Sequence, residues 1–476
     1  MVEHRGTVGR LTESGKTVKS HDVGGGEEGL TINRLPIRTH RAGHWTTICI
    51  GFALALALAQ PQARAESLKD ALASLSQTHP QIQAAAKLLQ AGKEREKEAF
   101  SGFLPHAAVD GETGPQHVTN HPPLNNGEDL NDRRDNARVS VTQNLFNGFG
   151  DSARLHAAEN NTAVLSATLD ATKQAVYLEA ITAYLNVLRE QRLINVSILN
   201  ERNIQNQLHL EDERVRRGAG ITVDVLQAKS RLQIARERRV AFEGRLRAAV
   251  ARYRQVFDKA PDIGALEDAR PRLDLLPKTL DDALALGRAN NPNGRISDFT
   301  ARANDDKRDI EMANYYPTLD LVGAAEYQSN TLGQEGRAES YSVVLRSRWE
   351  FFSGLRSRAR VEAATRTYEA SKSTRLFTLR KVDEEVRIAW ENLQTQRQRV
   401  DLLDNAVTIA EDVLRARHKL REAGKETALN VLDAEGEVFN AQINRIEAEY
   451  DARLANYRVM YATGQLNEKT LGLPNG

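Results

Sequence analysis

The spacing of apolar residues has a helical period over two very long stretches of the chain. No Pro or Gly interrupts the sequence from about Asp151 to Arg217, or from about Arg356 to Ala423. At 1.5 Å per residue, each stretch predicts a helix about 100 Å long. Within them, apolar residues at 3-4 spacing predict coiled-coil seams with charged outer faces. The seam residues are Leu178, Ile181, Leu185 and Leu188 in the first stretch and Val400, Leu403, Val407, Ala410 and Leu414 in the second.

Segments of period 2 come before each long helix and predict strands. Apolar and polar residues alternate over Leu319–Tyr327 and Tyr341–Trp349, over Val139–Leu145, and more weakly over Ala107–Thr113. Each pair predicts a β-hairpin with strands of about nine to eleven residues. The stretch His121–Asn136, HPPLNNGEDLNDRRDN, is predicted to be the longer of the two polar hairpin loops.

The order of these elements occurs twice. Ser67–Leu72 resembles Thr279–Leu284, and Phe146–Gly148 resembles Phe352–Gly354. Each repeat is predicted to begin with one helix of about 35 residues, and each long helix is followed by a glycine turn and a returning helix. The predicted domains are an N-terminal extension with a cleaved signal peptide (1–65), a first repeat (66–260), a linker (261–278), a second repeat (279–466) and a C-terminal tail (467–476).

The two first helices, over residues 66–103 and 279–315, are expected to end before a proline that cannot extend them. These prolines, Pro105 and Pro317, are the predicted strand entries. Where each hairpin ends, Gly148 and Gly354 are predicted to let the backbone turn sharply from strand to helix.

The N-terminal region has the pattern of a secretory signal peptide. A basic segment precedes about a dozen apolar residues at Ile48–Ala59, and Ala63–Ala65 forms an A-x-A site, so cleavage is expected before Glu66. A membrane anchor would need about 20 apolar residues. The only cysteine, Cys49, lies in this segment, so the mature chain is expected to contain no disulfide, no cysteine zinc site and no acylated cysteine.

Composition and motifs argue against two classes of protein. The chain is 27% charged with a net charge of +1, which does not favour a nucleic-acid partner. Its histidines lack metal-ligand spacing, and the usual hydrolase and P-loop motifs are absent, so we expect no enzyme, no metal and no cofactor. Gly148-Phe149-Gly150 could begin a dinucleotide-binding motif, but the third glycine is missing and the second repeat keeps only Gly354.

Four strands with one apolar face cannot close into a barrel, and open edges invite uncontrolled pairing. Strands of this length and pattern suit an outer-membrane barrel, which has eight or more strands in bacteria. Two chains would supply eight strands and three would supply twelve. The alternative is a non-channel periplasmic coiled-coil scaffold or adaptor, which requires that the strands lie outside the membrane.

The duplicated pattern resembles the TolC family of outer-membrane efflux and secretion channels over Glu66–Leu466. The resemblance is carried by paired start motifs, by Pro105 and Pro317, by the F-x-G strand exits, and by two turns, Gly218–Ala228 and Gly424–Ala434. It implies a mainly α fold with a small β part. Three copies would form a homotrimeric 12-stranded outer-membrane β-barrel, continued by a long periplasmic α-helical barrel.

The implied function is that of a passive exit duct for type I protein secretion or small-molecule efflux. Its expected partners are further copies of itself, a periplasmic adaptor, an inner-membrane ABC or RND transporter, and outer-membrane lipid. The missing acylated cysteine favours type I secretion over the lipid-anchored multidrug branch.

The same resemblance implies a gate at the far end of the long helices. Carried over by position, the entrance residues are Asn430 and Asp433, with Asp224 as the first-repeat partner. One expected acid is Asn430, so a double acidic ring is reduced to a single one at Asp433, which would favour cations. Alternatively, Asp224 and Asp433 merely stabilise helix N-termini.

Two more positions at these turns depart from the family pattern. Arg421 stands where the family has a tyrosine, and Glu426 where it has a basic residue. They could form a gate contact of opposite polarity, or they could be solvated surface charges. The turn glycines Gly218, Gly220 and Gly424 mark the expected adaptor contact.

Overall fold

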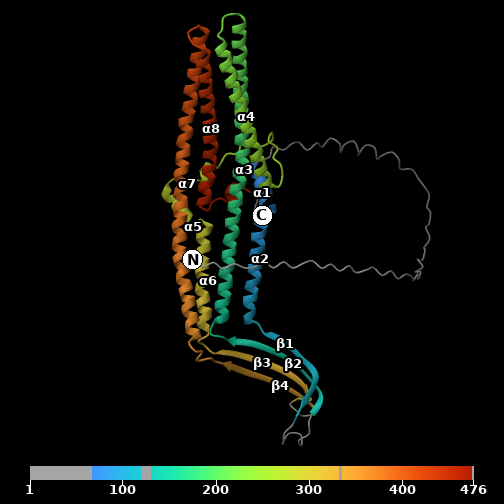
Figure 1. Ribbon diagram of the computed structural model, residues 1–476. Helices are drawn as coiled ribbons and strands as arrows, with labels where there is room; N and C mark the ends of the chain where they lie inside the picture. Colours follow the sequence, from blue (N-terminus) through green and yellow to red (C-terminus); the bar gives the residue numbers. More distant parts are fainter. Residues whose placement is uncertain (1–66, 120–129, 332–334, 474–476) are drawn as a thin grey trace, which may run out of the picture. The chain divides into compact units, whose positions relative to one another are not determined.

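The computed structural model describes residues 67–119, 130–331 and 335–473 (Figure 1). The chain divides into two units, residues 1–62 and 63–476, and the described residues belong to the second. The predicted signal peptide lies outside them. The elements are α1 (Leu68–Thr78), α2 (Pro80–Phe100), η1 (Ser101–Phe103), β1 (His106–Val118), β2 (Leu130–Phe146), α3 (Gly150–Arg216), α4 (Thr222–Phe257), η3 (Leu273–Leu275), α5 (Leu280–Asn290), α6 (Pro292–Ala313), β3 (Thr318–Ser329), β4 (Arg337–Arg348), α7 (Arg356–Glu422), α8 (Ala428–Ala462) and α9 (Glu468–Leu471).

Both long helices are present, and their predicted ends are confirmed to within one residue. α3 and α7 each contain 67 residues and are followed by the returning helices α4 and α8. Each long helix packs against its returning helix to form a hairpin, and α3 also packs along α8, so that the hairpins contact each other (Figure 1). None of the helices in the described ranges is both long enough and apolar enough to cross a membrane.

The prediction that each repeat begins with one continuous helix is wrong. Residues 66–103 and 279–315 each contain two helices, which are separated immediately before Pro80 and Pro292. His79 has φ −68° and ψ 126°, which is extended backbone. A proline ring clashes with a helical residue before it, so the first helix must end there, while the proline itself starts the next helix without losing a hydrogen bond.

The main core lies where α1, α3, α4 and α8 meet the linker and the C-terminal segment. Three tyrosines, Tyr177, Tyr184 and Tyr253, are fully buried in it. The Tyr184 hydroxyl donates to the Glu267 carbonyl at 2.8 Å, and the Tyr177 hydroxyl donates to Glu468 Oε1 at 3.0 Å. These bonds satisfy buried hydroxyls and also attach the linker and α9 to α3.

The four strands form one antiparallel sheet in the order β1-β2-β3-β4 (Figure 1). The register places residues of even number on one face of all four strands and residues of odd number on the other, up to a bulge near Asn144. The odd face carries an apolar band, and the even face is mostly polar. Exposed members of the band are Val109, Val139, Val141, Leu321, Val343 and Leu345.

The strands are longer than predicted, with 13, 17, 12 and 12 residues. The loop predicted over residues 121–136 is partly wrong, because β2 begins at residue 130; residues 121–129 lie outside the described part. Polar pairs stabilise this added length, with Thr113 Oγ1 donating to Asp135 Oδ1 at 2.5 Å and Arg134 pairing with Glu112 at 3.3 Å. Polar residues on both faces therefore continue the strands rather than end them.

Candidate entrance at the helical tips

The turn at the tip of each hairpin is built around a glycine with positive φ. Gly218 has φ +75°, and its N–H donates to the Val215 carbonyl at 3.0 Å. The next N–H, of Ala219, donates to the Arg214 carbonyl at 2.9 Å. This is a Schellman motif, which satisfies the last carbonyls of α3. Gly424, with φ +72°, ends α7 in the same way.

A buried ion pair joins the two hairpins near these turns. Arg421 of α7 pairs with Glu211 of α3, and only 11% and 4% of the two side chains are exposed. Arg421 is therefore not a solvated surface charge. Each charge offsets the desolvation of the other, so removal of Glu211 would leave Arg421 buried without this partner, and removal of Arg421 would leave Glu211 with its longer pairing to Arg214, at 4.0 Å.

A second ion pair between the hairpins involves the predicted entrance residue Asp433. Its carboxylate lies 2.5 Å from Arg231 Nη2 of α4, and both side chains are 46% exposed. Asp224, the partner inferred from the family pattern, lies in the first turn of α4, where a carboxylate stabilises the helix dipole. The sequence does not identify Arg231 as the ion-pair partner of Asp433, because α4 and α8 become neighbours only in the folded chain.

Glu426 and Asn430 form a local cap at the start of α8. The Thr427 N–H donates to Glu426 Oε1 at 3.0 Å, and the Asn430 side-chain amide donates to the same carboxylate. Thr427 Oγ1 in turn accepts from the Asn430 N–H at 3.3 Å, and Arg417 lies 3.4 Å from Glu426. The amide of Asn430, followed by the N–H of Thr427, holds the pKa of Glu426 below its usual value.

A buried acid that sequence reasoning missed lies between the hairpins. Glu435 of α8 is 8% exposed; its Oε1 accepts from Gln207 Nε2 of α3 at 3.5 Å and lies 3.9 Å from His418 Nε2 of α7. Its Oε2 has no hydrogen-bond partner among the described residues. Burial raises the pKa of Glu435 to about 7, and the Gln207 bond only partly opposes this.

The remaining predicted positions lie far from the tips, where strands meet helices. Gly148 and Gly354 have φ of +67° and +63°. A Cβ on Gly148 would lie 2.6 Å from the Ala313 carbonyl oxygen, so this turn also packs tightly against α6. Pro105 and Pro317 directly precede β1 and β3.

The last predicted position, Gly220, lies in the turn at the tip. A Cβ on Gly220 would lie 2.8 Å from a backbone nitrogen of α3.

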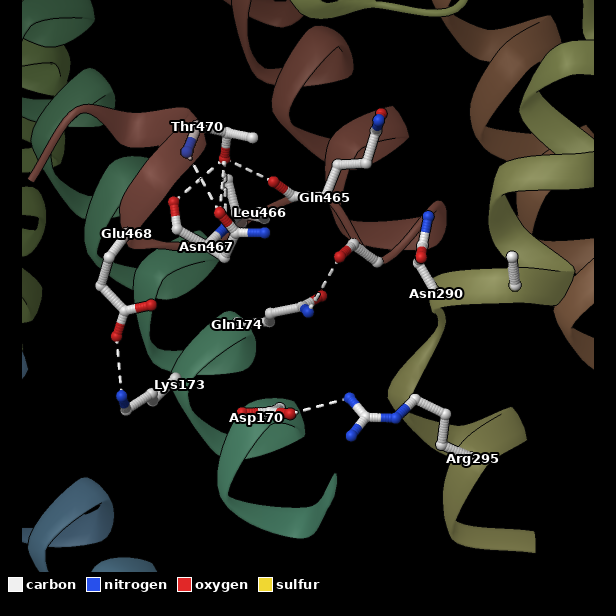
Figure 2. A pocket seen from close by; sticks show the side chains of 12 residues that line it. Asp170, Lys173, Gln174, Asn290, Arg295, Gln465, Leu466, Asn467, Glu468 and Thr470 are labelled. Carbon is white, nitrogen blue, oxygen red and sulfur yellow. Dashed lines mark hydrogen bonds and ion pairs between the residues drawn. The ribbon is translucent and has the colours of Figure 1, made fainter. Parts of the chain in front are cut away.

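A polar cavity of about 490 Å³ lies where α3, α5, α6 and the C-terminal segment meet (Figure 2). Lys173 pairs with Glu468 at 2.8 Å on one side of it, and Arg295 pairs with Asp170 at 2.9 Å on the other. Gln174 donates to the Gly464 carbonyl at 3.3 Å. These contacts fix the C-terminal segment and α6 to α3. No group of His, Cys, Asp or Glu side chains in the described ranges is arranged to hold a metal ion.

The family model described as outer membrane efflux protein matches residues 71–257 and 284–465, which is most of the chain. The chain belongs to the outer membrane efflux protein family. It is therefore an outer-membrane protein of a channel family, and the family resemblance inferred from the sequence is confirmed.

Individual members of the outer membrane efflux protein family show a distant but extended similarity. The outer membrane efflux protein BepC of Brucella suis is 24% identical over 70% of this chain and 73% of its own length. TolC of Escherichia coli is 23% identical over 86% and 84%. The alkaline protease secretion protein AprF of Pseudomonas aeruginosa is 22% identical over 89% of both chains.

The fold agrees with solved structures. The crystal structure of the outer membrane protein VceC from Vibrio cholerae superposes with a TM-score of 0.72, covers 83% of this chain and 96% of VceC, and is 16% identical. This confirms the predicted mainly α fold with a small β part. The relatives are channel proteins and not enzymes, in agreement with the sequence prediction.

Proposed function

We propose that three copies of this chain form a channel that serves as the passive exit duct of a tripartite export system. The observation that carries this proposal is the sheet, whose two edge strands, β1 and β4, each have a neighbour on one side only among the described residues. In lipid, an unpaired backbone group costs several kcal/mol. About a dozen such groups point outward from each edge, because alternate residues of a strand pair with each neighbour. Pairing with other copies removes this cost.

The direction of the strands suits closure by copies. β1 leads away from the helices and β4 returns to them, so β4 of one copy meets β1 of the next in an antiparallel arrangement. Each copy contributes four strands. Three copies give the twelve-stranded barrel expected from the family resemblance.

The odd face has the height needed to contact lipid. Its apolar band runs along β3 from Leu319 to Tyr327, which is about 26 Å along the strand and about 20 Å across a membrane at the tilt usual in barrels. Tyr327 and Tyr341 lie at the loop side of the band, and Trp349 lies at the helix side. Aromatic side chains at both borders are typical of the membrane interface.

At the other end, the ion pairs between the hairpins support a gate. Arg421–Glu211 and Arg231–Asp433 each join one hairpin to the other. A partner that separates the hairpins must break both pairs. We therefore assign these four residues to the closed entrance, with Asn430, Glu426 and Asp224 shaping the helix starts beside it.

The turn of the first hairpin carries a surface suited to a protein partner. Ile221, Val223 and Leu226 are exposed beside Gly218 and Gly220. An exposed apolar group on a tip that would lie in the periplasm is the proposed docking surface for the adaptor. The adaptor in turn would connect the duct to an inner-membrane ABC or RND transporter.

The proposed cargo is protein, exported by a type I system, with small-molecule efflux as the second candidate. AprF is a protease secretion protein by name and matches this chain over 89% of both lengths, whereas BepC, an efflux protein by name, matches over 70% of this chain. The proposed duct is passive and supplies no energy. The inner-membrane transporter would therefore select the cargo.

The proposal is tested by purifying the protein from outer membranes in mild detergent. We expect a trimer by mass measurement and stepwise conductance in planar bilayers. A stable, water-soluble monomer would contradict the proposal and favour the scaffold alternative. In a strain that lacks the gene, loss of one secreted protein with unchanged dye efflux would indicate that the channel serves protein secretion. Reduced dye efflux with unchanged protein secretion would indicate that it serves small-molecule efflux.

A further inference from the structure

The even face of the sheet carries its charges in separate rows. In the two rows nearest the helices, Arg348 lies opposite Thr318, and Arg346 lies opposite Asp320. The Asp320 carboxylate also accepts from the Asn144 amide at 2.8 Å. Two arginines and one aspartate leave one positive charge per chain at this level.

The next two rows contain no Asp, Glu, Lys or Arg. They consist of His106, Thr142, Val322 and Val344, and of Ala108, Ser140, Ala324 and Ser342. These rows separate the basic level from the charges nearer the loops.

The row beyond them has the opposite sign. Asp110, Arg138 and Glu326 lie side by side across β1, β2 and β3, which leaves one negative charge per chain. From this row to Arg346 the distance along the strand is about 20 Å, since six residues separate Ser340 from Arg346. The Debye length is about 8 Å at physiological ionic strength, so the two levels act as separate charges.

The arginines of the inner level form no ion pair within the described part of the chain, and Asp320 offsets only one of their two charges. No carboxylate of the described residues lies within ion-pair distance of the Arg346 or Arg348 side chain. By contrast, Arg134 near the loops pairs with Glu112 at 3.3 Å. The inner arginines are therefore free to bind an anion that approaches the even face.

We infer that the barrel interior carries two charge rings of opposite sign, and that the inner ring, formed by Arg346 and Arg348, binds anionic groups of the cargo. This rests on the proposed function, because the even face lines the lumen only when the sheets close. Three copies place six arginines around the passage at the junction of strands and helices. An arginine guanidinium binds carboxylate or phosphate groups in a bidentate manner.

The test measures single channels in a planar bilayer with a KCl gradient and with tripolyphosphate on the barrel side. The wild type is expected to be blocked by tripolyphosphate. In the R346Q/R348Q variant, the blocking concentration should rise several-fold and the reversal potential should shift toward the value for cations. The matched control is Arg337→Gln, on the odd face of the same strand, which should leave both readouts unchanged.

Several outcomes would overturn the inference. A conducting wild type that tripolyphosphate does not block contradicts it without any variant, and so does equal block of the wild type and the double variant. Should the double variant fail to assemble, the R346K/R348K variant, which keeps the charge, must retain block for the inference to stand. Absence of wild-type conductance would instead contradict the proposed function itself.

Discussion

Replacement of Glu435 by Gln tests whether a buried acid makes the contact between the hairpins depend on pH. Burial raises the pKa of Glu435 from 4.5 to about 7. Between these pH values the hairpins in contact bind more protons than separated hairpins would, so the free energy that holds the hairpins together falls as pH rises through this window and is lowest above pH 7. Gln cannot ionise, and the Glu435→Gln variant should lose this dependence.

The magnitude follows from the size of the pKa change. The rise of the Glu435 pKa from 4.5 to about 7 corresponds to at most roughly 3 kcal/mol of opening free energy. At pH 8 the variant should therefore hold its hairpins together more strongly than the wild type by up to about 3 kcal/mol, and at pH 5 the two should be nearly equal. The groups that face Glu435 are Gln207 on α3 and His418 on α7, with the Arg421–Glu211 pair nearby.

Hydrogen–deuterium exchange of the tip segments at pH 5, 6, 7 and 8, corrected for intrinsic rates, measures this opening free energy. The experiment is made in a His418→Asn background so that the imidazole cannot contribute. Glu437→Gln, at an exposed position two residues further along α8, is the matched control. If wild type and Glu435→Gln show the same pH dependence, the buried-acid explanation is refuted.

Three further predictions concern the contacts described above. Arg421→Ala should weaken the contact between the hairpin tips by about 3 kcal/mol in the same exchange assay, because it leaves the buried Glu211 carboxylate dependent on its longer pairing with Arg214, at 4.0 Å. Gly464→Ala should lower the urea midpoint strongly, since a Cβ there would lie 2.4 Å from a backbone oxygen at φ +73°. In bilayers, Asp433→Ala should reduce cation selectivity and Arg231→Gln should increase it, because each removes one member of a half-exposed ion pair.

The first two of these predictions have a control within the same chain. Arg216→Ala removes two exposed ion pairs, to Asp212 and Glu213, and should cost less than about 1 kcal/mol for each. Gly424 has φ +72° but open space around it, so its Ala variant should carry only the cost of the left-handed backbone, about 1–2 kcal/mol. Equal effects of the two glycine substitutions would contradict the argument that close packing makes Gly464 the more sensitive position. Unchanged ion selectivity in both the Asp433 and Arg231 variants would contradict the role given to this ion pair at the entrance.

The sequence predicts structure best where a single local conformational preference decides the backbone. The long helices could be predicted because no Pro or Gly interrupts them, and Gly218 and Gly424 because a positive φ favours glycine. The breaks before Pro80 and Pro292 follow from an equally local rule, but the helical period on both sides of each proline favours one continuous helix. The length of β2 was underestimated because its loop-side half is polar on both faces.

Contacts between the hairpins could not be predicted in the same way. Arg231 and Asp433 are 202 residues apart, and their pairing depends on how two helical hairpins pack. Glu435 did leave a signal, since it lies between Leu432 and Phe439 at helical spacing. A carboxylate inside an apolar stripe indicates a buried acid. The charge rows of the sheet required its register, which alternation alone does not give.

The two open strand edges also bear on how the protein can be made. In the proposed channel, neighbouring copies complete the sheet, so the stability of each chain would depend on its concentration, as in any obligate assembly. Substitutions in β1 or β4 should therefore appear as a lower yield of assembled protein at low expression, with little change in the melting of material that has already assembled. Quality control in the cell would act on the unassembled monomer. Its unpaired edge strands make it the species most prone to aggregate.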